Sequence, residues 1–139
     1  MKKLKGNLTE HLTIDDYGVN QTDTVTITPQ ALIHAQMLEE FIVWMNWKKR
    51  PSVNAWCRTA AYNKKVGGIS TSNHLKGTAT DLGVGEFTDA RFDKYARKWE
   101  EICKKYGAVG EIGRYSWGIH LGSYITYSNK FTIFDKRTT

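Results

Sequence analysis

Ser72-Asn73-His74-Leu75-Lys76-Gly77-Thr78-Ala79-Thr80-Asp81 is the most informative stretch of the chain, because it leads from a loop into a strand and carries two potential metal ligands. His74 ends a loop rich in glycine and serine (66–73), and Asp81 lies in the otherwise apolar, strand-like run 79–84. An unpaired carboxylate is costly to bury, so Asp81 needs a partner. A metal ion is one such partner, and a catalytic zinc typically has three protein ligands and an open fourth position.

A third potential ligand, His120, lies in a second apolar strand, Trp117-Gly118-Ile119-His120-Leu121. Two histidines and one aspartate from separate segments are a weak signal on their own. The residues alone therefore leave a second interpretation open, in which these are hydrogen-bonded core residues and a loop histidine. The remaining histidines, His11 and His34, are each expected to have an ordinary surface or packing role.

The apolar pattern predicts an α+β fold, with a small antiparallel sheet and two main helices. The first helix begins with Thr28 as N-cap and Pro29 at the first position, and it closes with the basic run 48–50. The second begins after Thr88, has apolar residues spaced by three and four, and ends at Gly107. Strands are expected at 53–58 and 78–84, followed by successive antiparallel strands at 109–114, 117–121, 124–127 and 131–134.

Length and composition limit the alternatives. The 139 residues correspond to one domain (1–139) with a polar N-terminal segment (1–27) of unclear role. No run of about 18 apolar residues occurs, so no membrane insertion is expected, and the basic start lacks the apolar stretch of a secretory signal peptide. Two cysteines, Cys57 and Cys103, argue against a disulfide scaffold. The net charge of +6 is dispersed, without the basic and aromatic stripe of a nucleic-acid module, so no nucleic-acid partner is expected.

The pattern S-x-H-x-x-G-x-A-x-D, which residues 72–81 fill at every specified position, resembles that of the zinc D-Ala-D-Ala carboxypeptidase and dipeptidase family. That family includes phage endolysin peptidases that cut L-alanyl-D-glutamate bonds, and it has the hedgehog/DD-peptidase fold. The run Trp-Cys-Arg-Thr-Ala-Ala-Tyr-Asn (56–63) is similar to the family's strand and arginine turn, and 117–120 is similar to its closing W-x-x-H strand. The resemblance covers residues 28–127 and implies a hedgehog/DD-peptidase-like fold.

The resemblance also implies roles for individual residues. His74, Asp81 and His120 would bind zinc (Zn2+), which lowers the pKa of its bound water and polarises the scissile carbonyl. Arg58 would lie at the mouth of the site as a catalytic or substrate-binding group, because its guanidinium can steady an oxyanion or a substrate carboxylate. The alternative for Arg58 is an ordinary solvated arginine.

Two further residues of this region have roles that follow from the resemblance. Ser72 would hydrogen-bond a peptide group of the substrate, or it would only shape its own loop. Gly77 would let the backbone approach closely beside the metal.

The general base is where the sequence departs from the family pattern. Many members have a carboxylate three residues before the last histidine, where this chain has Trp117, or an aspartate two residues after it, where this chain has Gly122. Glu111 is the best replacement as catalytic base. If residues 115–116 form a two-residue hairpin turn, Glu111 lies directly opposite His120, whereas a three-residue turn would place it on the other face.

Together these observations favour a zinc metallopeptidase that hydrolyses peptidoglycan stem peptides or crosslinks, as a phage or prophage lysin or a cell-wall remodelling enzyme. It would be made in the cytoplasm without a signal peptide and would act on the bacterial cell wall after release. The missing acid at position 117 supports an alternative, a non-catalytic relative that binds peptide or a protein partner. A small nucleic-acid-binding protein has only the charge in its favour. The bond cut, endo or exo action and the oligomeric state stay open.

Overall fold

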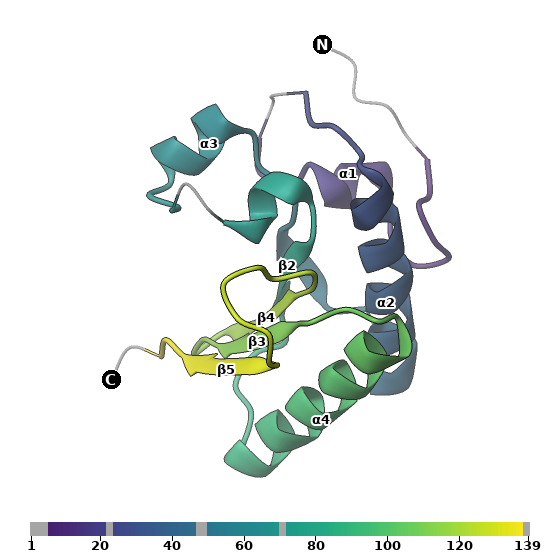
Figure 1. Ribbon diagram of the computed structural model, residues 1–139, viewed down its shortest axis with the longest axis vertical. Helices are drawn as coiled ribbons and strands as arrows, with labels where there is room; N and C mark the ends of the chain where they lie inside the picture. The colour runs from purple at the N-terminus through teal and green to yellow at the C-terminus, as the bar shows by residue number, and fades with distance from the viewer. Residues whose placement is uncertain (1–5, 22–23, 47–49, 70–71, 138–139) are drawn as a thin grey trace.

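A computed structural model describes residues 6–21, 24–46, 50–69 and 72–137 (Figure 1). It has an α+β fold, as predicted. The α-helices are α1 (Ile14–Tyr17), α2 (Pro29–Met45), α3 (Ala60–Lys65) and α4 (Asp89–Lys105), and η1 (Asn73–Lys76) is a 3-10 helix. The strands are β1 (Ser52–Ala55), β2 (Ala79–Gly83), β3 (Glu111–Arg114), β4 (Gly118–Gly122) and β5 (Thr132–Asp135). Ser70 and Thr71 of the glycine- and serine-rich loop lie outside the described residues.

The two main helices begin as predicted. Thr28 caps α2 by accepting a hydrogen bond from the Ala31 amide at 3.0 Å, and Thr88 caps α4 in the same way. The end of α4 is also confirmed, since Gly107 has a φ of +66°. The prediction for the end of α2 was wrong: the helix stops at Met45, because Asn46 adopts a left-handed conformation there. Of the basic run 48–50, residues 48 and 49 lie outside the described residues.

The five strands form one sheet in the order β1-β2-β4-β3-β5. All pairs are antiparallel except β3 and β5, which run parallel, so the prediction of successive antiparallel strands was wrong at the last strand. The predicted strand at 124–127 is part of a loop (123–131), in which Tyr124 has a left-handed φ of 56°. β4 and β5 lie on either side of β3, so this loop crosses the start of β3, where the Ile125 amide donates to the Val109 carbonyl at 3.0 Å.

The core lies between one face of the sheet and the helices α2 and α4 (Figure 1). Ile112, Ile119 and Leu121 turn their side chains to this face and are fully buried. Side chains alternate along a strand, so His120, between two of these residues, points to the opposite face. On the core side, Trp99 of α4 donates a hydrogen bond from Nε1 to the Gly122 carbonyl at 2.9 Å, which ties the helix to the end of β4.

The polar N-terminal segment takes part in this fold. Thr13 and Asp16 form a reciprocal capping box at the start of α1, and Leu12 and Tyr17 are fully buried. The Tyr17 carbonyl accepts the Cys57 amide at 2.9 Å, which joins the segment to the chain that follows β1. The sequence analysis assigned no role to residues 1–27, and the described part of them supports the region that leads to η1.

Both cysteines are buried as free thiols. Among the described residues, no helix is long and apolar enough to cross a membrane.

Candidate metal centre

His74 is held by the short helix η1, which follows the glycine- and serine-rich loop. The Ser72 side chain caps η1 by accepting the His74 amide at 3.2 Å. Nδ1 of His74 lies 2.7 Å from the Trp56 carbonyl oxygen, which can only accept, so Nδ1 carries the proton. The other ring nitrogen, Nε2, is therefore free to act as a metal ligand.

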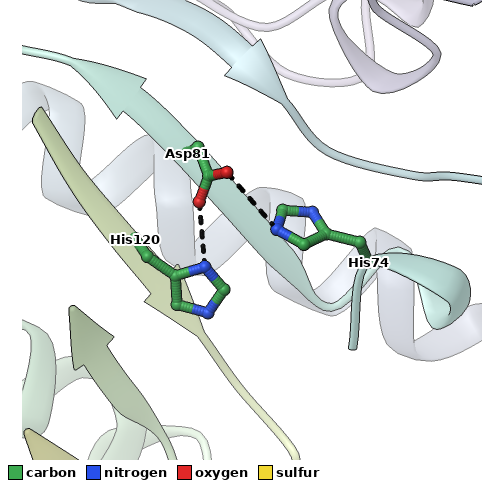
Figure 2. Close-up of side chains that lie close together, drawn as sticks. All are labelled: His74, Asp81 and His120. Carbon is green, nitrogen blue, oxygen red and sulfur yellow. Dashed lines mark hydrogen bonds and ion pairs between the residues drawn. The ribbon is translucent and has the colours of Figure 1, made fainter. Parts of the chain in front are cut away.

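Asp81 and His120 come from the neighbouring strands β2 and β4, where the register places them directly opposite each other. Oδ1 of Asp81 lies 2.8 Å from Nδ1 of His120, and Oδ2 lies 3.5 Å from Nε2 of His74. Figure 2 shows the two rings approaching the carboxylate from two sides. All three residues are buried, with exposed fractions of 4% for His74, 7% for Asp81 and 8% for His120. The structure thus brings together the three residues that the sequence analysis proposed as ligands.

The geometry and charge of this cluster fit a divalent metal ion. One potential ligand atom from each residue lies within 4.8 Å of the others. Burial would raise the pKa of Asp81, but its contacts with His120 and His74 outweigh burial and hold that pKa below its ordinary value. Burial would likewise lower the pKa of His120, while hydrogen bonds with Asp81 and Glu111 raise it to about 9. The carboxylates therefore stabilise positive charge, which a cation site requires.

Glu111 lies on the same face as His120, but not in the predicted register. The Tyr115 amide donates to the Gly118 carbonyl at 2.9 Å, so the hairpin turns at residues 116–117, one residue later than predicted, and Glu111 pairs with Gly122 instead of His120. Because the register is displaced by two residues, the face is unchanged. Oε1 of Glu111 lies 3.0 Å from Nε2 of His120, and Oε2 accepts a hydrogen bond from the Tyr127 hydroxyl.

Arg58 and Ser72 are each hydrogen-bonded to the backbone of His74, which places them next to the cluster. The Arg58 amide donates to the His74 carbonyl at 2.8 Å, and its guanidinium donates to Asn63 Oδ1 at 3.3 Å. Arg58 is partly buried, and the alternative of an ordinary solvated arginine stays open. The Ser72 hydroxyl is engaged in capping η1, in agreement with a loop-shaping role. Contacts of either residue with substrate remain predictions.

The sequence analysis missed two aromatic residues that border the site. Tyr127 reaches Glu111 from the loop 123–131, and Phe134 of β5 packs over Gly113 with its ring centroid 5.4 Å from that of His120. Neither residue has a local signal. Both are placed there by the crossing loop and by the parallel pairing of β5 with β3.

A third aromatic residue, Tyr115, lies in the hairpin between β3 and β4. Its ring stacks on Trp117 with centroids 5.0 Å apart, and Trp117 itself is 43% exposed. Burial, the charge of Asp81 and that of Glu111 raise the pKa of Tyr115 to about 12, against the opposing charge of Arg58. Tyr115 therefore lies within electrostatic range of the cluster and remains protonated at neutral pH.

Gly77 is required by its close packing against Tyr17 and α2. It ends η1 with a φ of +71°, and a Cβ there would collide with Tyr17 and with Ala31 of α2.

We expect Gly77→Ala to lower the free energy of unfolding by about 2–4 kcal/mol, from left-handed strain and overpacking together. Denaturant unfolding measures this. The matched control is Gly107→Ala, where φ is +66° but no atom lies within 4 Å, so about 1 kcal/mol is expected. Equal losses in the two variants would contradict the packing argument.

Comparison with known proteins agrees with this geometry. The sequence model of the Peptidase M15 family matches residues 10–121, which include all three members of the cluster and extend into the N-terminal segment. No curated protein is significantly similar to the chain. The family match covers most of the sequence, so the chain belongs to the Peptidase M15 family.

Proposed function

We propose that this protein is a zinc-dependent peptidase that hydrolyses peptide bonds in peptidoglycan stem peptides or crosslinks. The observation that carries the proposal is the buried cluster of His74, Asp81 and His120 in a chain of the Peptidase M15 family. Two imidazoles and one carboxylate are a ligand set typical of catalytic zinc. The setting would be a phage or prophage lysin or a cell-wall remodelling enzyme, which acts on the wall after release from the cytoplasm.

The chemistry expected of the site divides between the metal and the protein. Zinc, when bound, would polarise the scissile carbonyl and supply a nucleophile by lowering the pKa of water. Arg58, next to the cluster through the His74 carbonyl, would hold a substrate carboxylate or the developing oxyanion. The sequence analysis assigned the role of general base to Glu111, and this stays a prediction.

The alternative is a relative that keeps the fold and the metal but binds peptide without cutting it. Its support is that positions 117 and 122 carry Trp and Gly, and that both oxygens of Glu111 are already bonded. A search for hydrolysis separates the two proposals directly.

Mass spectrometry of peptidoglycan digested by the zinc-loaded protein tests the proposal and names the bond. We expect new amino and carboxyl ends at a single type of peptide bond, and no such ends after treatment with a chelator. Re-addition of zinc should restore cleavage. If the zinc-loaded protein leaves every stem peptide and crosslink intact, the enzymatic proposal is wrong and the binding alternative is favoured.

A further inference from the structure

The two ring nitrogens of His120 face two different carboxylates. Nδ1 faces Asp81, whose other oxygen faces His74, so this nitrogen is turned to the inside of the cluster (Figure 2). Nε2 faces Glu111, which therefore contacts the ring at the nitrogen that points away from Asp81. His74 has the same arrangement, with Nε2 turned inward and Nδ1 bonded to the Trp56 carbonyl. Each histidine thus has one nitrogen for a metal and one held by an oxygen acceptor.

Glu111 is itself held in place from both sides. Its Oε1 is engaged by His120 and its Oε2 by Tyr127, and only 7% of the residue is exposed. The hydrogen bond to Tyr127 accompanies a ring that is 65% exposed, so burial of the ring does not explain where Tyr127 lies. The contact exists because the loop 123–131 crosses the start of β3, where Glu111 is the first residue.

Space for the Glu111 carboxylate is made by the neighbouring strand. Gly122 of β4 pairs with Glu111, and a Cβ at position 122 would lie 2.6 Å from Cγ and 2.7 Å from Oε1 of Glu111. Such distances are too short for any side chain larger than that of glycine unless Glu111 moves. The absence of a side chain at position 122 and the presence of the acid at position 111 are therefore two parts of one arrangement.

From these contacts we propose that Glu111 is a positioning residue for His120, and that Tyr127 in turn positions Glu111. A histidine ligand generally donates its second N–H to a carboxylate or carbonyl, which fixes the tautomer and the orientation of the ring. Glu111 keeps the proton of His120 on Nε2 and leaves Nδ1 for the metal. The inference rests on the proposed function only in taking the cluster as a zinc site.

Zinc affinity, measured by competition with a chromophoric chelator, tests this role independently of hydrolysis. We expect Glu111→Ala to lower the affinity about 10- to 100-fold. Glu111→Gln should retain most of the zinc affinity, because its amide oxygen can still accept from Nε2. Nitrogen NMR of the zinc-loaded protein should find the proton of His120 on Nε2.

Tyr127→Phe tests the second step without removing an acid. It should weaken zinc binding less than Glu111→Ala does. Its matched control is Tyr106→Phe, which breaks a similar hydrogen bond between Tyr106 and Glu40 of α2, away from the cluster, and should leave the zinc affinity unchanged. An equal loss of affinity in Tyr127→Phe and Tyr106→Phe would overturn the role of Tyr127.

Measurements of zinc affinity and of hydrolysis decide the role of Glu111. Unchanged zinc affinity in folded Glu111→Ala would overturn the proposal. Loss of hydrolysis in Glu111→Gln at saturating zinc, with unchanged affinity, would make Glu111 the general base instead. A wild-type protein that binds no zinc would remove both this inference and the proposed function. A protein that binds zinc but leaves peptidoglycan intact would remove only the proposed function, and the affinities would still decide the inference.

Discussion

His74→Ala and Asp81→Ala are each expected to abolish stoichiometric zinc binding and to lower peptide hydrolysis by at least about 10³-fold. Metal catalysis contributes several kcal/mol to a transition state, and about 4 kcal/mol corresponds to a factor of 10³. Loss of one ligand from a three-ligand site leaves the metal with too few protein donors. His74→Ala also removes the ring held by the Trp56 carbonyl, while Asp81→Ala removes the carboxylate that faces both imidazoles.

Metal analysis after dialysis, together with the peptidoglycan digest, measures both effects. The control is His11→Ala, because Glu10, His11 and Glu39 form a second group that could hold a metal in the described part of the chain. That group is more exposed, and Glu39 already bonds to Thr9 and to His11. We expect His11→Ala to keep the full zinc content. If zinc were lost from His11→Ala and kept in His74→Ala, the metal site would lie at the N-terminal group instead.

The metal ligands could be predicted because residues 72–81 resemble the pattern of a zinc peptidase family, whereas the spacing of the three residues alone left a core-residue interpretation open. Asp81 and His120 each lie in an apolar strand at a position that faces away from the helices, and the pairing of these two strands, seen in the structure, brings them together. Glu111 was placed on the correct face for an incorrect reason, since the turn lies one residue later than predicted and the resulting register displacement of two residues is even. Only an odd displacement would have removed Glu111 from the site.

The surroundings of the centre could not be predicted in the same way, because they depend on long-range topology. Tyr127 looked like part of a strand, and its contact with Glu111 exists only because the loop 123–131 crosses β3 and β5 turns parallel. α1 is one turn long, too short for an apolar period to reveal it. The capping pair Thr13 and Asp16 was its one local signal.

His34→Ala is expected to lower the free energy of unfolding by about 3–5 kcal/mol. His34 lies on α2 and is fully buried between the rings of Trp56 and Trp99. Its Nδ1 lies 2.8 Å from Ser123 Oγ and its Nε2 lies 2.9 Å from Thr80 Oγ1. The variant would leave a cavity and two buried hydroxyls without this partner. Thr80 precedes Asp81 in β2, and Ser123 is the first residue of the loop 123–131. His34 therefore supports both the strand that carries Asp81 and the loop that carries Tyr127.

His34 should also make the free energy of unfolding depend on pH. Burial, followed by the positive charge of His120 and of His74, lowers the pKa of His34 from 6.5 to about 3. Between these values the unfolded chain binds a proton at His34 that the folded protein does not. The contribution is therefore complete above pH 6.5 and falls as the pH drops toward 3, by about 1.4 kcal/mol per pH unit.

Denaturant unfolding of the wild type and of His34→Gln between pH 7 and pH 4 isolates this effect. Glutamine keeps a donor and an acceptor but does not titrate, and acid-sensitive groups that do not interact with His34 are common to both proteins and cancel in the difference. The stability advantage of the wild type over His34→Gln should shrink steadily below pH 6.5. Parallel curves over the whole range would mean that the imidazole accepts a proton inside the folded core, and that the contacts with Ser123 and Thr80 do not require a neutral ring.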